Sequence, residues 1–239
     1  MYSLADLFSI MSYHLHIILQ NYIFVLAHFC VLVLWWRYLR KRHFRQSQRS
    51  CCMSHAAILE RYQQQLLVVM ILVSLVLSLI LYFPMRVMLF LGNDFVYVAG
   101  VVLGWRRGWP VMLVGLLCLV GRILLQGEGC VWVLYVVLDV LVYYLTGGIV
   151  RTMLHVDADI LSWSDILFVS INKILVSIFS ATCWLLLMQD TWSNGFNLLL
   201  FRLVGWPLIS LPLIALLLML LREDYRQAVT LDGKCAVLP

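Results

Sequence analysis

The chain is divided into long apolar runs of about 18 to 25 residues, separated by short polar clusters. Wound as a helix, a run of that length spans the hydrocarbon core of a bilayer, which is about 30 Å thick. Composition agrees, because 64% of the residues are hydrophobic and only 12% are charged, against about 25% charged in ordinary soluble domains. A water-soluble fold of this size cannot bury so much apolar surface. We therefore predict an all-α, polytopic membrane helix bundle.

The distribution of arginine and lysine predicts how the bundle is oriented. The candidate spans cover residues 15–36, 66–83, 87–104, 111–125, 130–149, 166–188 and 198–221. If the N-terminus is outside, the inner segments hold Arg37, Arg40, Lys41, Arg42, Arg45, Arg49, Arg61, Arg106, Arg107, Arg151, Arg222, Arg226 and Lys234. The outer loops hold only Arg86. Because cytoplasmic loops carry an excess of these residues, we expect about seven transmembrane helices with the C-terminus in the cytoplasm.

No linker long enough to separate two folded domains interrupts the chain. We expect one membrane domain over residues 1–221 and a cytoplasmic tail over residues 222–239. The positive residues lie in loops and not along a face that could follow a phosphate backbone, so nucleic-acid binding is not expected.

Motifs for catalysis or for metal binding are not found. The sequence has no P-loop, no His-Glu-x-x-His motif and no nucleophile with a plausible base, so we expect no enzymatic activity and no catalytic residues. Its cysteines are scattered, without a Cys-x-x-Cys pair, and His14 and His16 have no acidic or thiol partner nearby. We expect neither a metal nor a cofactor.

Five charged residues lie within or at the ends of the spans, where function is best sought. They are Asp94, Arg122, Asp139, Lys173 and Arg202. A charge at membrane depth costs at least about 2.5 to 3.5 kcal/mol, so each should face the bundle or a wet cavity and have a partner.

These charges suggest a ligand site. With the topology above, Asp94, Arg122 and Arg202 fall in the outer half of the membrane, together with Glu128. Two arginines near one another suit a small carboxylate, because guanidinium holds a carboxylate bidentately and stays charged when partly desolvated. The predicted ligand-binding residues are Asp94, Arg122, Glu128, Asp139 and Arg202. Alternatively, Asp94 and Asp139 simply neutralise Arg122, Arg202 or Lys173 and hold the helices together.

Glycine spacing in the central part of the chain gives a family resemblance. The pattern is Gly100 and Gly104, then Gly108-Trp-Pro110, Gly115, Gly121-Arg122, Gly127-Glu-Gly129 and Gly147-Gly148. It resembles the five-transmembrane receptor domain at the N-terminus of LytS-type sensor histidine kinases and of some GGDEF diguanylate cyclases. The resemblance extends over residues 66–221, and Arg122 is the position most directly carried over from the family.

The resemblance implies a multi-pass sensor of the bacterial cytoplasmic (inner) membrane that binds a small anionic ligand. After Leu221 the sequence resembles the polar linker to an output domain, and we expect the output domain itself to be missing. Signalling would then pass to a cytoplasmic partner or through a homodimer, or the output has been lost. Two alternatives stay open, namely the substrate-binding subunit of a vitamin transporter and a membrane scaffold without a ligand.

Overall fold

The computed structural model describes residues 23–42, 55–85, 90–125, 129–154, 162–188 and 206–235. Within these ranges the regular elements are all helices, in agreement with the predicted all-α class. An N-terminal helix covers Ile23–Arg42. It is followed by α2 (His55–Met85), α3 (Gly92–Leu125), α4 (Cys130–Met153), α5 (Trp163–Met188) and α7 (Trp206–Cys235).

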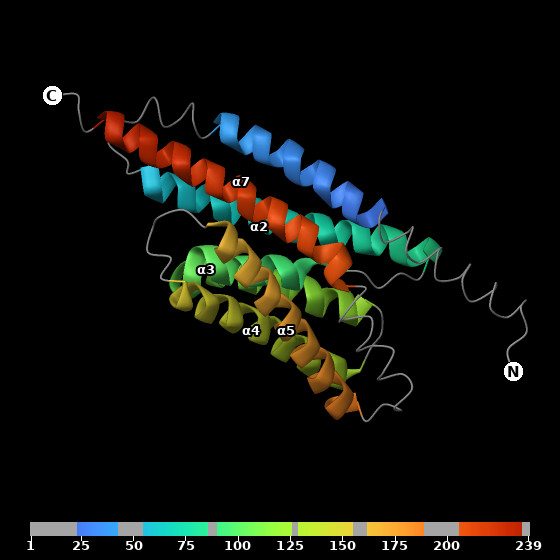
Figure 1. Cartoon of the computed structure of the whole chain (residues 1–239). Coiled ribbons are helices and arrows are strands. Elements are labelled where there is room, and N and C mark those ends of the chain that lie inside the picture. The colour runs from blue at the N-terminus through green and yellow to red at the C-terminus, as the bar shows by residue number, and fades with distance from the viewer. Residues whose placement is uncertain are drawn as a thin grey trace, which may run out of the picture.

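The helices lie roughly along a common direction and form a bundle (Figure 1). The N-terminal helix, α2 and α7 lie side by side, and α3, α4 and α5 form the rest of the bundle. Of the helices in the described ranges, five are long and apolar enough to cross a membrane, namely Ile23–Arg42, Leu59–Ile80, Gly92–Leu125, Cys130–Met153 and Trp163–Cys183. Large apolar side chains such as Leu117 (63% exposed) and Leu125 (76% exposed) cover the outside, as expected where lipid is the solvent.

The helix α3 is a hairpin and not a straight rod. Its backbone leaves helical geometry at Gly104, with φ 71° and ψ 179°. A Cβ atom on Gly115 would lie 2.5 Å from Val96 Cγ2, and one on Gly108 would lie 3.0 Å from the carbonyl oxygen of Ala99. In a straight helix Val96 and Gly115 would be about 28 Å apart. The first arm (residues 92–103) and the second arm (residues 105–125) are therefore antiparallel and packed together.

This hairpin differs from the sequence prediction in where the chain turns. The predicted third and fourth spans leave a loop between residues 104 and 111, whereas in the structure Gly104 alone reverses the chain. A residue with φ near +71° and ψ near 180° is strained unless it is glycine. Arg106 and Arg107 consequently lie in the first turn of the second arm.

Glycines let α4 approach the first arm closely. A Cβ atom on Gly100 would lie 2.6 Å from the carbonyl oxygen of Tyr144, and one on Gly147 would lie 2.3 Å from that of Tyr97. Only glycine leaves room for two backbones at this separation, as in other membrane helix pairs. Gly148 faces the ring of Trp105, whose Nε1 would lie 1.3 Å from a Cβ atom there, so packing accounts for both Gly147 and Gly148.

Two side chains of α4 also donate hydrogen bonds to backbone carbonyl oxygens at the turn where the first arm ends. Tyr144 donates its hydroxyl hydrogen bond to the carbonyl oxygens of Trp105 (2.6 Å) and Gly104 (3.2 Å). Arg151 donates to the carbonyl oxygens of Val102 and, at 3.3 Å, Val101. A helix C-terminus leaves carbonyls without intrahelical partners and carries a partial negative charge, so a guanidinium there is favourable.

Positive side chains from several helices meet at the end of the bundle where α3 reverses. Arg107 Nη1 lies 2.8 Å from Glu60 Oε2 of α2, and Arg40 Nε of the N-terminal helix lies 3.8 Å from Asp224 Oδ1 of α7. We call this end of the bundle, which also holds the Gly104 turn and Arg151, the basic end.

Candidate functional site

Polar side chains, all of them buried except the partly buried Asn93, gather in the interior of the bundle, between α3, α4, α5 and α7. We call this group the polar cluster. Its members are Asn93, Asp94, Tyr135, Asp139, Lys173, Ser177, Ser180 and Ser210.

An ion pair between α3 and α5 forms one half of the cluster. Lys173 Nζ lies 3.0 Å from Asp94 Oδ1, and the two side chains are 0% and 2% exposed. Lys173 also donates a hydrogen bond to the hydroxyl oxygen of Ser210 on α7. Asp94 lies in the first turn of α3, where the partial positive charge of the helix N-terminus favours a carboxylate. Lys173 therefore connects three helices.

The carboxylate of Asp139 on α4 forms the other half. Asn93 donates its amide hydrogen bond to one carboxylate oxygen, and Ser180 donates its hydroxyl hydrogen bond to the other. The hydroxyls of Ser180 and Tyr135 are 3.0 Å apart and are hydrogen-bonded. Because Asn93 and Asp94 are neighbours in the chain, the start of α3 belongs to both halves.

The cluster lies well inside the length of the bundle. Counted along the helices, Asp94 is about 15 Å from Gly104, and Lys173 is about 15 Å from Trp163 at the start of α5. Ser210 is about 21 Å from Asp224 along α7. Gly104 and Asp224 lie at the basic end, and Trp163 is placed there too, because the guanidinium of Arg222 lies 5.8 Å from its ring. All three helices thus place the cluster at a similar depth.

Arg122 lies farther from the basic end than the cluster does. Along the second arm it is about 27 Å from Gly104. Its side chain is 7% exposed, and its guanidinium lies 5.9 Å from the centre of the Phe90 ring, just before α3 begins. A guanidinium over an aromatic face is a favourable cation–π contact in a desolvated site.

The structure thus brings together some of the predicted ligand-binding residues. Asp94 and Asp139 belong to the polar cluster, whereas Arg122 lies toward the opposite end of the bundle. Glu128 and Arg202 fall outside the described residues. The pairing of Asp94 with Lys173 is one of those that the sequence analysis considered as a way to hold helices together.

The cluster also contains residues that the sequence analysis did not assign to a site. Ser180 and Ser210 give no signal by themselves, because serines in membrane helices are common packing residues. Ser180 lies two helical turns after Lys173, so spacing on α5 offers the only hint. Ser210 could not have been found by spacing, since its contact with Lys173 joins two separate helices.

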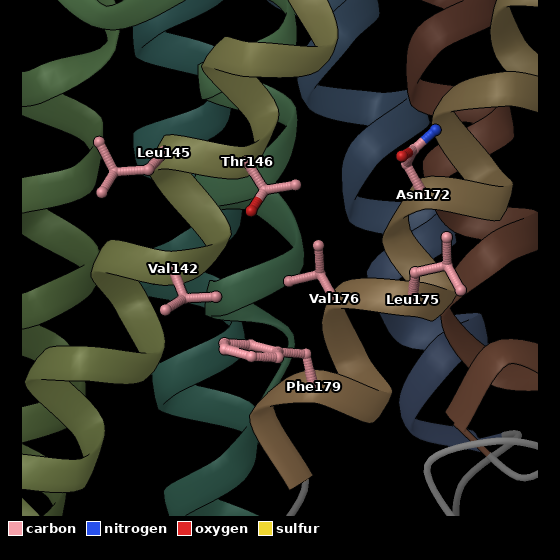
Figure 2. A pocket seen from close by; sticks show the side chains of 7 residues that line it. All are labelled: Val142, Leu145, Thr146, Asn172, Leu175, Val176 and Phe179. Atoms are coloured by element: carbon pink, nitrogen blue, oxygen red, sulfur yellow. The ribbon is translucent and has the colours of Figure 1, made fainter. Parts of the chain in front are cut away.

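A groove on the outside of the bundle lies apart from the cluster. It runs between α4 and α5, has a volume of about 390 Å³, and is lined mainly by aliphatic side chains and Phe179 (Figure 2). Thr146 and Asn172 are its polar residues, and Asn172 already donates its amide hydrogen bond to the carbonyl oxygen of Phe168. None of the predicted ligand-binding residues lines it.

A third buried carboxylate lies at the basic end, beyond the apolar run of α7 that ends at Leu221. Trp36 Nε1 donates a 2.6 Å hydrogen bond to Asp224 Oδ2, and the Asp224 side chain is 1% exposed. Burial raises the pKa of this carboxyl from 3.8 to about 6, although the hydrogen bonds from Trp36 and Tyr62 and the charge of Arg40 oppose the shift. This contact fixes α7 to the N-terminal helix.

Fold and site together define a multi-pass helical membrane protein with buried, paired charges. Within the part of the chain that the structure describes, no group of His, Cys, Asp and Glu side chains is arranged to hold a metal ion. No family model matches the chain, and neither the curated proteins nor the solved structures gave a match.

Proposed function

We propose that this protein is a sensory, receptor-like protein of the bacterial inner membrane that binds a small anionic molecule and passes a helix shift to its cytoplasmic end. One observation carries the proposal. Lys173 is held by Asp94 of α3 and also donates a hydrogen bond to Ser210 of α7. From Ser210 α7 continues as one helix to Cys235, a length of about 38 Å. A change at the ion pair can therefore act directly on a helix that reaches the basic end.

The mechanism is a competition between carboxylates. A small anion that enters from the Arg122 end offers Lys173 a second carboxylate in place of Asp94. Such a ligand favours the helix arrangement in which its own contact with Lys173 is made, and a difference in affinity between two arrangements is all that a population shift requires. Because Lys173 also holds Ser210, the two arrangements differ in the position of α7.

The packing supports seven crossings with the N-terminus outside. The hairpin of α3 supplies two antiparallel arms. The first arm is about 18 Å long and is counted as part of the predicted span 87–104, and α7 contributes the apolar run that ends at Leu221. With the N-terminal helix, α2, α4 and α5 this gives about seven crossings, and the positive-inside rule places the basic end in the cytoplasm. A signal arriving along α7 would then reach the cytoplasm.

Hydrogen exchange of the purified protein in lipid nanodiscs tests the proposal. Acetate, succinate and citrate serve as probes, and exchange is followed in residues 222–235 for the wild type, Arg122→Gln and Arg106→Gln. We expect one of these carboxylates to change exchange in the wild type and in Arg106→Gln, but not in Arg122→Gln. Binding that leaves residues 222–235 unchanged would contradict a sensory role.

A scaffold without a ligand is the second candidate, and one observation favours it. Asp94 and Lys173 neutralise each other, and the carboxylate of Asp139 accepts two hydrogen bonds within the bundle. In this candidate function, the only role of the buried charges is to hold the helices together. This candidate predicts that Asp94→Asn, Asp139→Asn and Lys173→Met change stability alone, and that no probe carboxylate protects the wild type against thermal unfolding.

A further inference from the structure

Two tryptophans and an arginine form an exposed face at the start of the second arm of α3. Trp105 and Trp109 are 51% and 54% exposed, and Arg106 beside them is exposed as well. Trp109 lies three positions after Arg106 and four after Trp105, and residues at these spacings are neighbours on a helix surface. We call these three residues the Trp105–Arg106–Trp109 face.

The described residues offer no ion-pair or hydrogen-bond partner to the arginine of this face, in contrast to the neighbouring Arg107 and Arg151. Arg107 is bound to Glu60 at 2.8 Å, and its backbone carbonyl accepts a 2.7 Å hydrogen bond from Gln64. Arg151 donates hydrogen bonds to the backbone carbonyls at the end of the first arm. Within the described residues Arg106 makes no ion pair, so its guanidinium is available to an outside partner.

The apolar surface next to the face points to a lipid as that partner. Leu113 and Leu117 continue along the second arm from Trp109 at helical spacing and are 41% and 63% exposed. A molecule that occupies this surface contacts aliphatic side chains toward the middle of the membrane. It contacts two indole rings and a guanidinium near the basic end. A phospholipid has its acyl chains and its phosphate in this order.

We propose that the Trp105–Arg106–Trp109 face binds the headgroup of an anionic phospholipid, with the acyl chains along Leu113 and Leu117. Tryptophan side chains favour the headgroup region of a bilayer. The ring nitrogen of Trp105 lies against Gly148 of α4, so Trp105 contributes the exposed part of its ring to the face. Arginine binds a phosphate through two parallel hydrogen bonds and remains charged at the interface. An anionic lipid is preferred to a zwitterionic one because the latter brings its own positive charge to the guanidinium.

Native mass spectrometry of the full chain in detergent tests the proposal. The probes are phosphatidylglycerol and phosphatidylcholine with identical acyl chains, titrated against the wild type, Arg106→Gln, Arg106→Lys and Arg107→Gln. A basic residue at the surface of an anionic membrane contributes enough for about a fivefold change in affinity. We expect Arg106→Gln to lose about fivefold in phosphatidylglycerol affinity, Arg106→Lys to lose less, and Arg107→Gln to stay close to the wild type.

Three outcomes would overturn the proposal. The wild type could bind both lipids equally, in which case the face does not select for charge. Arg106→Gln and Arg107→Gln could lose the same affinity, in which case the basic end attracts lipid without a defined site. Excess inorganic phosphate could displace phosphatidylglycerol, in which case the face is a general anion site. Because these measurements do not involve the polar cluster, their result is independent of the proposed sensory function.

Discussion

Asp94 and Lys173 form a 3.0 Å ion pair between α3 and α5 in which both side chains are almost fully shielded. Removing one member leaves the other charge buried without its partner, which typically destabilises a protein by about 3 to 5 kcal/mol. We expect Lys173→Met to lower the stability of the purified protein by an amount of this order, measured by thermal unfolding in detergent. Ser210 would lose its donor in the same variant.

The double variant Asp94→Asn, Lys173→Met is the control for that prediction. It removes both charges and keeps similar volumes, so we expect it to be clearly more stable than Lys173→Met alone. Equal stability of the single and double variants would mean that the two charges do not interact in the folded protein.

The contact between α3 and α4 depends on glycine. A Cβ atom on Gly147 would lie 2.3 Å from the carbonyl oxygen of Tyr97, and backbone cannot rotate away as a side chain can. We expect Gly147→Ala to destabilise the protein by about 1 to 3 kcal/mol, the usual cost of overpacking. Thermal unfolding checks this.

Gly121 provides the matched control, because nothing lies within 4 Å of a Cβ atom built there. In the interior of a helix alanine is favoured over glycine by about 0.5 to 1 kcal/mol. Gly121→Ala should therefore be neutral or stabilising. If Gly147→Ala behaves in the same way, the two helices are not packed as closely as described.

The turn of the α3 hairpin makes a separate prediction. At Gly104, φ is 71° and ψ is 179°, a conformation that costs other residues about 1 to 3 kcal/mol. We expect Gly104→Ala to lower the unfolding temperature, whereas Gly121→Ala should not, since nothing lies within 4 Å of a Cβ atom built on Gly121. If Gly104→Ala had the same unfolding temperature as the wild type, the chain would not reverse at Gly104 in the conformation described.

The helical class could be predicted from the sequence, and the glycines noted there as a family resemblance prove to lie at close helix contacts, because both are local patterns. Apolar runs of membrane length predict helices wherever they occur. Small residues such as Gly100 and Gly147 within those runs indicate close helix contacts. The turn at Gly104 was placed only approximately, since a hairpin that reverses at one glycine resembles a short loop in the sequence.

The partners of the buried charges could not be predicted in the same way. Spacing along one helix identifies the inward face, but it does not say which helix faces which. Asp94 had Arg122, Arg202 and Lys173 as candidate partners, and only the packing of α5 against α3 places Lys173 beside it. The contact between Trp36 and Asp224 likewise joins opposite parts of the chain. Tertiary arrangement decides such pairs.

The carboxyl of Asp224 predicts how stability depends on pH. Burial raises its pKa from 3.8 to about 6, so between these values the folded protein holds a proton that the unfolded chain releases. The contribution of Asp224 to the free energy of unfolding is therefore greatest near pH 4 and falls as the pH rises to about 6. Above pH 6 this contribution does not change further. An asparagine at this position cannot ionise and should lack that fall.

The measurement is the unfolding temperature of the wild type minus that of Asp224→Asn, followed from pH 4 to pH 7 in one detergent. Other carboxyls titrate in both proteins and cancel in the difference. We expect the difference to become more negative as pH rises to about 6 and then to level off. If Arg40, 3.8 Å away, kept the carboxylate ionised throughout, the difference would not vary with pH, and the contact between Arg40 and Asp224 would be an ion pair over the whole range.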